Sequence, residues 1–205
     1  MEGFTKVRPD APPGFFEVEA AGLAWLCVDG GVPVAEVLDV GPDGWEGDGY
    51  IGHAQLPLRP HATWGEFYAL ERLLPYARRA GLGSGLAAIE RLAGRLVVGA
   101  FDDGASPARI HGDLWAGNVL FTSASATLVD PAAHGGHRIS DLAMLALFGL
   151  QHLTDVYAGY EEACTALPDG WRDLIGLHQL HPLLVHAVLF GGGYGARAVG
   201  IAATY

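Results

Sequence analysis

The chain has 205 residues, 50% of them hydrophobic and 17% charged, with a formal net charge of −11 and an isoelectric point near 5.1. This composition supports a sizeable core, in one large domain or a small domain attached to a larger one, and excludes general disorder. The acidic balance, without any Lys/Arg-rich run, excludes a nucleic-acid partner bound through clustered cations, although one lysine and a bound Mg²⁺ still suit a small phosphate ligand.

The sequence predicts a cytoplasmic protein. Residues 1–10 lack the apolar core of a signal peptide. The longest apolar stretch, from Pro182, is broken by His186 and is too short to cross a bilayer, so no membrane partner is expected. Cys27 and Cys164 lie far apart in apolar, helix-like surroundings, which favours two buried reduced thiols. The expected state is a monomer or a homodimer.

The first 61 residues predict strand, helix, strand and a long loop. A strand end at 4–7 precedes a turn-rich link, and a helix follows from Phe15 to about Val28. Residues 32–40 predict a second strand. Pro33 lies near its start, where proline is tolerated in an edge strand. Residues 41–61 are rich in Gly and Pro without periodicity, so they mark either a lobe boundary or a place where an expected segment is missing.

Helices dominate the remainder. One is expected over about 63–80, bent or broken by Pro75, and a second from Ser84, as its N-cap, to about Val98. A short apolar lead-in at 108–110 precedes a hairpin, with strands at 118–121 and 127–130. Further helices are expected at 140–148, 153–164, 171–176, 178–190 and after the last glycines. This order predicts an α+β fold rather than a regular βαβ alternation.

Polar residues gather at the predicted hairpin. Residues 109–121 read R-I-H-G-D-L-W-A-G-N-V-L-F, with Asp113 and Asn118 five residues apart, and Asp130 ends the second strand. Because a hairpin returns the chain, Asn118 and Asp130 should lie side by side and form an oxygen site that suits Mg²⁺. Asp113 would lie slightly off the metal and accept a proton from an incoming hydroxyl. This division of roles is that of phosphoryl transfer.

Simpler interpretations exist for single residues. Asp113 alone could cap a turn, and Asn118 alone could be a turn amide, but their combination with Asp130 favours a site. His111 is expected to support the loop by hydrogen bonding rather than to act as an acid or base. His134 has a second histidine three residues later, but no third and fourth ligand with zinc spacing follows. The histidines of the segment 178–186 are expected to be buried with satisfied ring nitrogens.

Two longer motifs carry a family resemblance. H-G-D-L-W-A-G-N-V-L, followed by V-D-P-A-A-H-G-G-H-R-I-S-D-L-A-M-L, resembles the fructosamine kinase (ketosamine kinase) family. That family belongs to the protein-kinase-like superfamily, beside the aminoglycoside and choline kinases. The superfamily shares H-G-D-x-x-x-x-N and the later D-P, whereas L-W-[SA]-G-N and G-G-H-R…D-L-A-M point to the ketosamine branch. The likeness covers nearly the whole chain from Phe4.

The resemblance implies a protein-kinase-like two-lobed fold. A small, partly missing β-rich N-lobe would occupy residues 1–45, and a mainly helical C-lobe with a catalytic β-hairpin would occupy 46–205. It implies an ATP- and Mg²⁺-dependent kinase for a sugar hydroxyl of a ketosamine, free or protein-bound, as in protein repair. The alternatives are an aminoglycoside or other small-molecule phosphotransferase, and an inactive kinase-like binding module.

Residue by residue, the resemblance implies a nucleotide and metal site. Asp113 would be the catalytic base, and Asn118 and Asp130 would bind Mg²⁺. Lys6 would contact the nucleotide phosphates and pair with Glu19. Glu17 is the competing choice for this pair.

The remaining matched residues concern the substrate and the loop. Trp115 is expected to face the sugar-amine substrate, and His134 is expected either to line the substrate pocket or to pack against the loop. His111 would support the catalytic loop, and Asp141 would brace it from the start of a helix, a role compatible with a plain N-cap. The family's glycine-containing phosphate loop and its hinge have no counterpart here, which implies either a longer protein or a shortened relative.

Overall fold

The computed structural model describes residues 6–37, 48–122, 125–164 and 167–205. In chain order its elements are α1 (Phe15–Leu26), β1 (Gly49–Ile51), β2 (Ala54–Leu56), α2 (Trp64–Phe67), the π-helix η1 (Tyr68–Leu73), α3 (Leu74–Arg79), the 3-10 helix η2 (Gly83–Gly85), α4 (Leu86–Val97), β3 (Ala108–Ile110), the 3-10 helix η3 (Ala116–Asn118), β4 (Val119–Phe121), β5 (Ala126–Leu128), β6 (His134–Gly136), α5 (Ile139–Leu147), α6 (Leu153–Ala163), the 3-10 helix η4 (Trp171–Leu174), α7 (Ile175–Phe190) and α8 (Tyr194–Ala202). The mixed α+β architecture is therefore confirmed.

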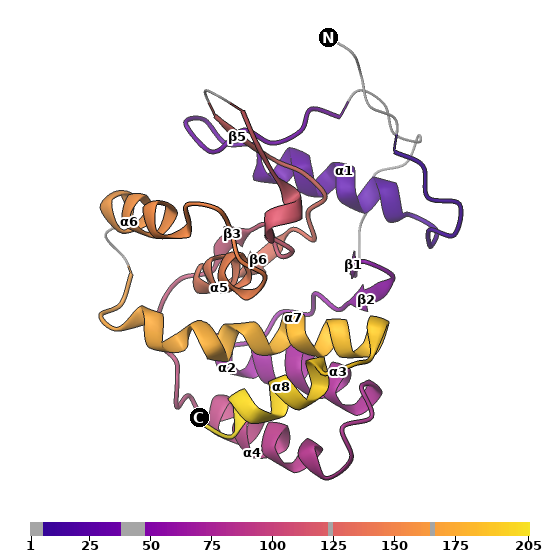
Figure 1. Ribbon diagram of the computed structural model, residues 1–205, viewed down its shortest axis with the longest axis vertical. Helices are drawn as coiled ribbons and strands as arrows, with labels where there is room; N and C mark the ends of the chain where they lie inside the picture. Colours follow the sequence, from indigo (N-terminus) through magenta and orange to yellow (C-terminus); the bar gives the residue numbers. More distant parts are fainter. Residues whose placement is uncertain (1–5, 38–47, 123–124, 165–166) are drawn as a thin grey trace.

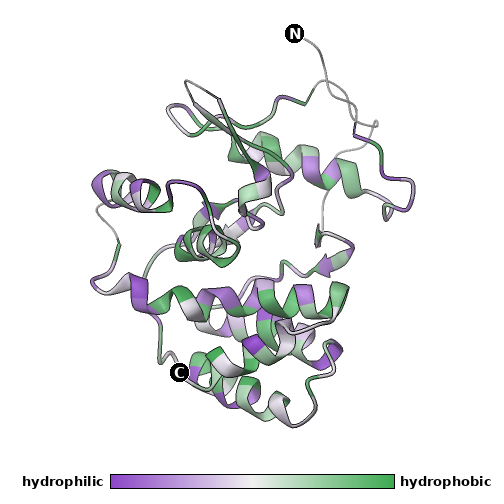
Figure 2. Cartoon of the chain, in the orientation of Figure 1, coloured by the Kyte–Doolittle hydropathy of each residue, from purple (hydrophilic) through white to green (hydrophobic). Residues whose placement is uncertain are grey.

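Helix α7 is the centre of the core. It crosses the middle of the molecule, with α3, α4 and α8 on one side and α5, α1 and the small sheets on the other (Figure 1). Leu177, Leu180 and Leu183 of α7 are fully buried. Figure 2 shows hydrophilic residues interrupting its hydrophobic run. Within the described residues, the stretch Trp171–Phe190 is long and apolar enough to cross a bilayer, but 56% of it is buried, as in a core helix.

The helix predicted over 63–80 changes its geometry at Pro75. Thr63 caps its start, accepting a hydrogen bond from the backbone N–H of Glu66 at 3.1 Å. The chain stays helical to Arg79, but a π-helical segment from Tyr68 to Leu73 precedes the proline. Pro75 has no N–H and its ring would crowd the carbonyl one turn earlier, so the widened π turn accommodates it. The next helix begins at Leu86, so Ser84 is not its N-cap.

The loop predicted over 41–61 contains a hairpin. Strands β1 and β2 pair antiparallel, with Gly49 opposite Leu56 and Ile51 opposite Ala54. Gly52 supplies the turn with a φ of 56°, a conformation that glycine adopts without strain. The strands are only three residues long, too short for a visible periodicity. Residues 41–47 lie outside the described part.

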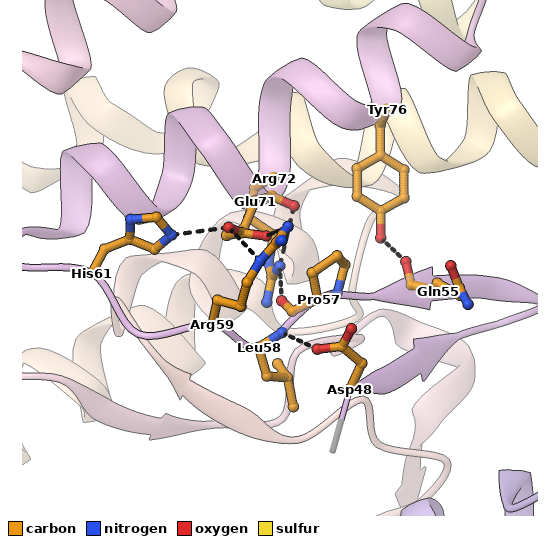
Figure 3. Close-up of polar contacts among 9 residues, drawn as sticks. All are labelled: Asp48, Gln55, Pro57, Leu58, Arg59, His61, Glu71, Arg72 and Tyr76. Carbon is orange, nitrogen blue, oxygen red and sulfur yellow. Dashed lines mark hydrogen bonds and ion pairs between the residues drawn. The ribbon is translucent and has the colours of Figure 1, made fainter.

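A cluster of charged residues, of which Glu71 and Arg72 are buried, fastens the segment after this hairpin to the π-helix (Figure 3). Glu71 is 3% exposed and accepts from Arg59 Nη2 at 2.9 Å and from His61 Nε2 at 2.9 Å. Arg72 is 2% exposed and donates to the Pro57 carbonyl at 2.7 Å. The sequence did not reveal these buried charges. They hold the hairpin β1–β2, which forms one side of the cleft described below.

The two predicted N-terminal strands are not formed in the described residues. Lys6 and Val7 are not in a strand, and residues 4–5 lie outside the described part. Of residues 32–37, only Val34 makes a bridge, parallel to Leu128, and 38–40 are again outside. A strand requires a ladder of backbone hydrogen bonds. Pro33 has no backbone N–H, so it can accept a hydrogen bond but cannot donate one to this ladder. A single bridge results.

The hairpin predicted at 118–121 and 127–130 is shorter at both polar ends. Strand β4 pairs with β5, with Val119 opposite Leu128. Asn118 therefore ends the 3-10 helix η3, and Asp130 lies in the turn after β5. The lead-in at 108–110 is strand β3, which pairs with β6.

Helices predicted at 171–176 and 178–190 are not separate, because η4 runs directly into α7. The prediction of two buried thiols is also wrong. Cys27 is exposed and Cys164 is half-buried. Cys27 immediately follows the C-terminus of α1.

Candidate active site

One cleft of about 270 Å³ joins segments far apart in the sequence. Its walls come from the N-terminal arm with α1, the β1–β2 turn, the loop between β3 and β4, the turn after β5 and the C-terminal end of α7. Six of the nine residues singled out from the sequence line it: Lys6, Glu19, Asp113, Trp115, Asn118 and Asp130. His111, His134 and Asp141 lie behind the loop rather than in the cleft.

The loop that carries Asp113 is held from behind by a half-buried carboxylate. Asp141 accepts from the backbone N–H of His111 at 2.7 Å and of Gly112 at 2.9 Å. Helix α5 begins at Ile139, so Asp141 lies in its first turn and is not a plain N-cap. Burial raises the pKa of Asp141 to about 6, against the opposing effect of the two N–H donors. Both carboxylate oxygens of Asp141 therefore accept hydrogen bonds from the loop backbone.

His111 supports the loop as a neutral imidazole. Its Nε2 donates to the carbonyl of Val129 at 2.9 Å, and its Nδ1 accepts from the backbone N–H of Asp113 at 3.3 Å. These partners assign one donor and one acceptor nitrogen, as in the uncharged ring. Burial lowers the pKa of His111 to about 4, which agrees with that assignment. The side chain links the loop before β4 to the end of β5.

Asp113 has the electrostatics of a carboxylate poised near neutral pH. Burial, followed by the negative charges of Asp130 and Asp141, raises the pKa of Asp113 to about 6. Asn118 is 6% exposed, and its Nδ2 donates to the carbonyls of Asp113 at 2.8 Å and Asp130 at 3.3 Å. The amide nitrogen is thereby committed to the backbone, and Oδ1 is left as the coordinating atom of the side chain.

Asp130 lies in an unusual backbone conformation next to Lys6. Its φ is 55°, in the left-handed region that non-glycine residues rarely adopt. Lys6 Nζ lies 2.9 Å from Asp130 Oδ1 and 2.7 Å from Glu19 Oε2. Glu19, rather than Glu17, thus faces the lysine from α1.

The donor set of the cleft fits a divalent cation that prefers oxygen. Asn118 offers an amide oxygen and Asp130 a carboxylate that is 44% exposed, beside the carboxylate of Asp113. Burial is the main cause of the raised pKa of Asp113, and the negative charges of Asp130 and Asp141 add a repulsion that a bound cation would relieve. In the described part of the chain, no group of three or more His, Cys, Asp or Glu side chains forms a metal site.

The cleft has an aromatic side that sequence reasoning only half found. Trp115 is 40% exposed and meets Phe148 edge-on, with ring centroids 6.2 Å apart. His186 and Phe190, four residues apart on α7, also line the cleft. Their i, i+4 spacing places them on one helix face, but nothing local indicated that this face meets residues 113–130.

His134 is not part of the cleft. It is 9% exposed, its Nδ1 donates to the Ala132 carbonyl at 2.7 Å, and it packs behind Gly112. It lines a small cavity of about 30 Å³ together with Arg72, His178 and His181. Within the described residues, the Nε2 atoms of those last two histidines have no hydrogen-bond partner, so the expectation of satisfied rings is wrong. Burial alone does not guarantee a partner for both ring nitrogens.

Known proteins define the class of this chain. A family model described as fructosamine kinase matches residues 39–204. A probable ketoamine kinase from Thermus thermophilus is 32% identical over 231 residues, covering 92% of this chain and 82% of the relative. One from Synechocystis is 35% identical over 159 residues, covering 76% of this chain and 52% of the relative. The chain therefore spans about half the length of some relatives that it matches.

Two solved structures are also similar to this chain. A crystal structure described as a candidate fructosamine-3-kinase from Thermobifida fusca is 42% identical, with a TM-score of 0.80, covering 95% of this chain and 81% of that one. A counterpart from Haemophilus somnus is 20% identical with a TM-score of 0.74, covering 93% and 79%, and supports the fold alone. The family model and these relatives place the protein among the phosphotransferases. Within that class, the chain belongs to the fructosamine kinase family.

Proposed function

We propose that this protein is an ATP- and Mg²⁺-dependent kinase that phosphorylates a sugar hydroxyl of a ketosamine. The observation that carries the proposal is the convergence of Asp113, the Asn118–Asp130 oxygen pair and the Lys6–Glu19 ion pair on one cleft. A phosphoryl-transfer site needs these parts: a carboxylate for the nucleophile's proton, oxygen ligands for the metal and a positioned cation for the phosphates.

Each residue has a defined task in the proposed reaction. Asp113 accepts the proton of the attacking hydroxyl, and because its pKa is about 6 it is mostly ionised at neutral pH. Asn118 and Asp130 hold Mg²⁺, which neutralises charge on the phosphates. Lys6, oriented by Glu19, contacts the phosphates. His111 and Asp141 keep the loop in place, so that most of the rate gain comes from positioning.

The proposed acceptor is a ketosamine such as a fructosamine or ribulosamine, including adducts on protein lysines. Trp115 supports this choice, because its exposed ring offers an apolar face to a sugar. We also propose that the chain has two lobes, as in protein kinases: a small N-terminal lobe, residues 1–45, and a helical lobe, residues 46–205. ATP would bind between them. We propose a cytoplasmic location and a monomer or homodimer as the working state.

A substrate panel tests the proposal. The purified protein is incubated with Mg²⁺-ATP and fructose-lysine, ribulose-lysine or kanamycin, and ADP release is measured. Turnover with a ketosamine is expected, and Asp113→Asn should lower kcat by about 10²–10⁴-fold. Turnover with kanamycin alone would instead indicate an aminoglycoside phosphotransferase. ATP binding without turnover of any acceptor would indicate a binding module.

A further inference from the structure

The cations of the cleft are not equally available to a ligand. Lys6 is already paired with two carboxylates, Glu19 at 2.7 Å and Asp130 at 2.9 Å. Arg8 lines the same cleft. Among the described residues, no carboxylate lies within ion-pair distance of its guanidinium, and no hydrogen bond is formed by it. Within the described part of the chain, Arg8 is therefore the cation of this cleft whose N–H groups are available to donate hydrogen bonds to a ligand.

Arg8 is nevertheless held in position. Its guanidinium carbon lies 4.8 Å from the centroid of the Phe15 ring, and Lys6 Nζ lies 5.7 Å from the same centroid. Phe15 is 8% exposed and begins helix α1, so the ring is a fixed platform. Stacking on an aromatic face leaves the edge of the guanidinium plane, where its N–H groups point, free for a planar or tetrahedral anion.

The charge of the cleft selects the ligand that Arg8 would meet. The amine of a ketosamine is cationic or neutral, so it gains nothing from a guanidinium and is better served by the carboxylates of Asp113 and Asp130. A polyphosphate carries several negative charges and binds the guanidinium fork with two parallel hydrogen bonds. We propose that Arg8 is a phosphate-binding residue, which engages the polyphosphate of the phosphoryl donor beside Lys6, whose orientation Glu19 maintains. The proposal rests on the kinase function given above.

A metal-free binding measurement isolates this contact. Inorganic tripolyphosphate is titrated calorimetrically into the full chain in the presence of a chelator, so that neither adenine recognition nor Mg²⁺ contributes. Arg8→Met should weaken tripolyphosphate binding by about 10-fold or more, the usual effect of removing hydrogen bonds to a charged group. Arg8→Lys should recover part of the affinity, because it restores the charge but not the fork.

The matched control is Arg91→Met, which removes the same charge from an exposed position of α4. It should leave tripolyphosphate binding nearly unchanged. Equal affinities for the Arg8 and Arg91 variants, or no binding of tripolyphosphate by the unmodified protein, would overturn the assignment. Thermal unfolding of each variant shows that the comparison is made between folded proteins.

Kinetics separate this inference from the function on which it rests. With a turned-over ketosamine, Arg8→Met should raise the KM for ATP about 10-fold and leave kcat within about 3-fold, because the contact is made equally in the ground and transition states. An unchanged KM in an otherwise active kinase refutes the role of Arg8 alone. Absence of turnover in the unmodified protein, with tripolyphosphate binding still dependent on Arg8, refutes the proposed kinase function and leaves the anion site standing.

Discussion

The two walls of the cleft are built in different ways. The loop wall, residues 108–141, is held by hydrogen bonds to its backbone, notably those from the N–H groups of His111 and Gly112 to Asp141. The N-terminal wall, residues 6–26, is attached through side chains: the Lys6 ion pairs and the contact of Arg109 with the Trp25 carbonyl and ring. The loop that carries Asp113 is thus fixed by hydrogen bonds to its backbone. The charged groups of the N-terminal wall are held by ion pairs instead.

This comparison predicts that substitutions in the loop wall cost far more stability than those in the N-terminal wall. Gly112→Ala should have the largest effect. Gly112 has a φ of 80°, and a Cβ there would overlap the Ala132 carbonyl oxygen. Left-handed strain plus this overlap should lower the free energy of unfolding by about 4 kcal/mol or more. Urea denaturation measures the change.

Gly94→Ala is the matched control, since a Cβ at Gly94 meets nothing within 4 Å and the residue lies inside α4. It should be neutral or slightly stabilising. A Gly112→Ala protein as stable as the Gly94 variant would show that the loop frame is not rigid.

The second prediction concerns the brace. Asp141→Ala removes the acceptor of two backbone N–H groups, of which the one of His111 belongs to a buried residue. Leaving them unpaired should lower the free energy of unfolding by about 2–4 kcal/mol. The exposed Asp155, in the first turn of α6, is the control, and its change to Ala should have little effect. Equal effects of the two changes in urea denaturation would contradict the bracing role.

The third prediction separates stability from activity at Asp113. Its pKa is about 6 in the folded protein, against about 3.9 for an unperturbed Asp, so ionisation costs folding free energy. The stability that the protonated carboxyl contributes is complete below pH 4 and is lost as the pH rises through 6. Asp113→Asn should therefore stabilise the protein by about 3 kcal/mol at pH 8 and by little at pH 4, while lowering kcat by about 10²–10⁴-fold. A pH-independent difference in denaturation midpoint would refute the raised pKa.

The smallest stability effect is expected in the N-terminal wall. Glu19→Gln weakens a half-buried ion pair and should change the free energy of unfolding by about 0–1 kcal/mol. It should still lower kcat/KM for ATP, because Lys6 loses its orienting partner. Glu17→Gln is the control on the same helix turn and should alter neither quantity. Identical kinetics for the two variants would reopen the choice between these glutamates.

Most helices and the hairpin β4–β5 could be predicted from the sequence, because their patterns are local and long enough to read. The secondary-structure predictions were wrong where contacts with other segments decide the structure. Residues 32–37 have strand-like composition but make one bridge, at Val34. The hairpin β1–β2 was hidden in a glycine-rich stretch with strands of three residues. The π turn before Pro75 reflects a steric conflict that sequence periodicity does not express.

The sequence by itself determined the kinase family and the loop with Asp113 and Asn118, since both depend on residue types at short, fixed spacings. Only the tertiary structure decided what surrounds that loop. It placed Lys6 against Asp130, brought Arg8 and His186 into the cleft and set His134 behind it. Such contacts join residues up to about 180 positions apart, and they depend on how helices pack around α7 rather than on any local pattern.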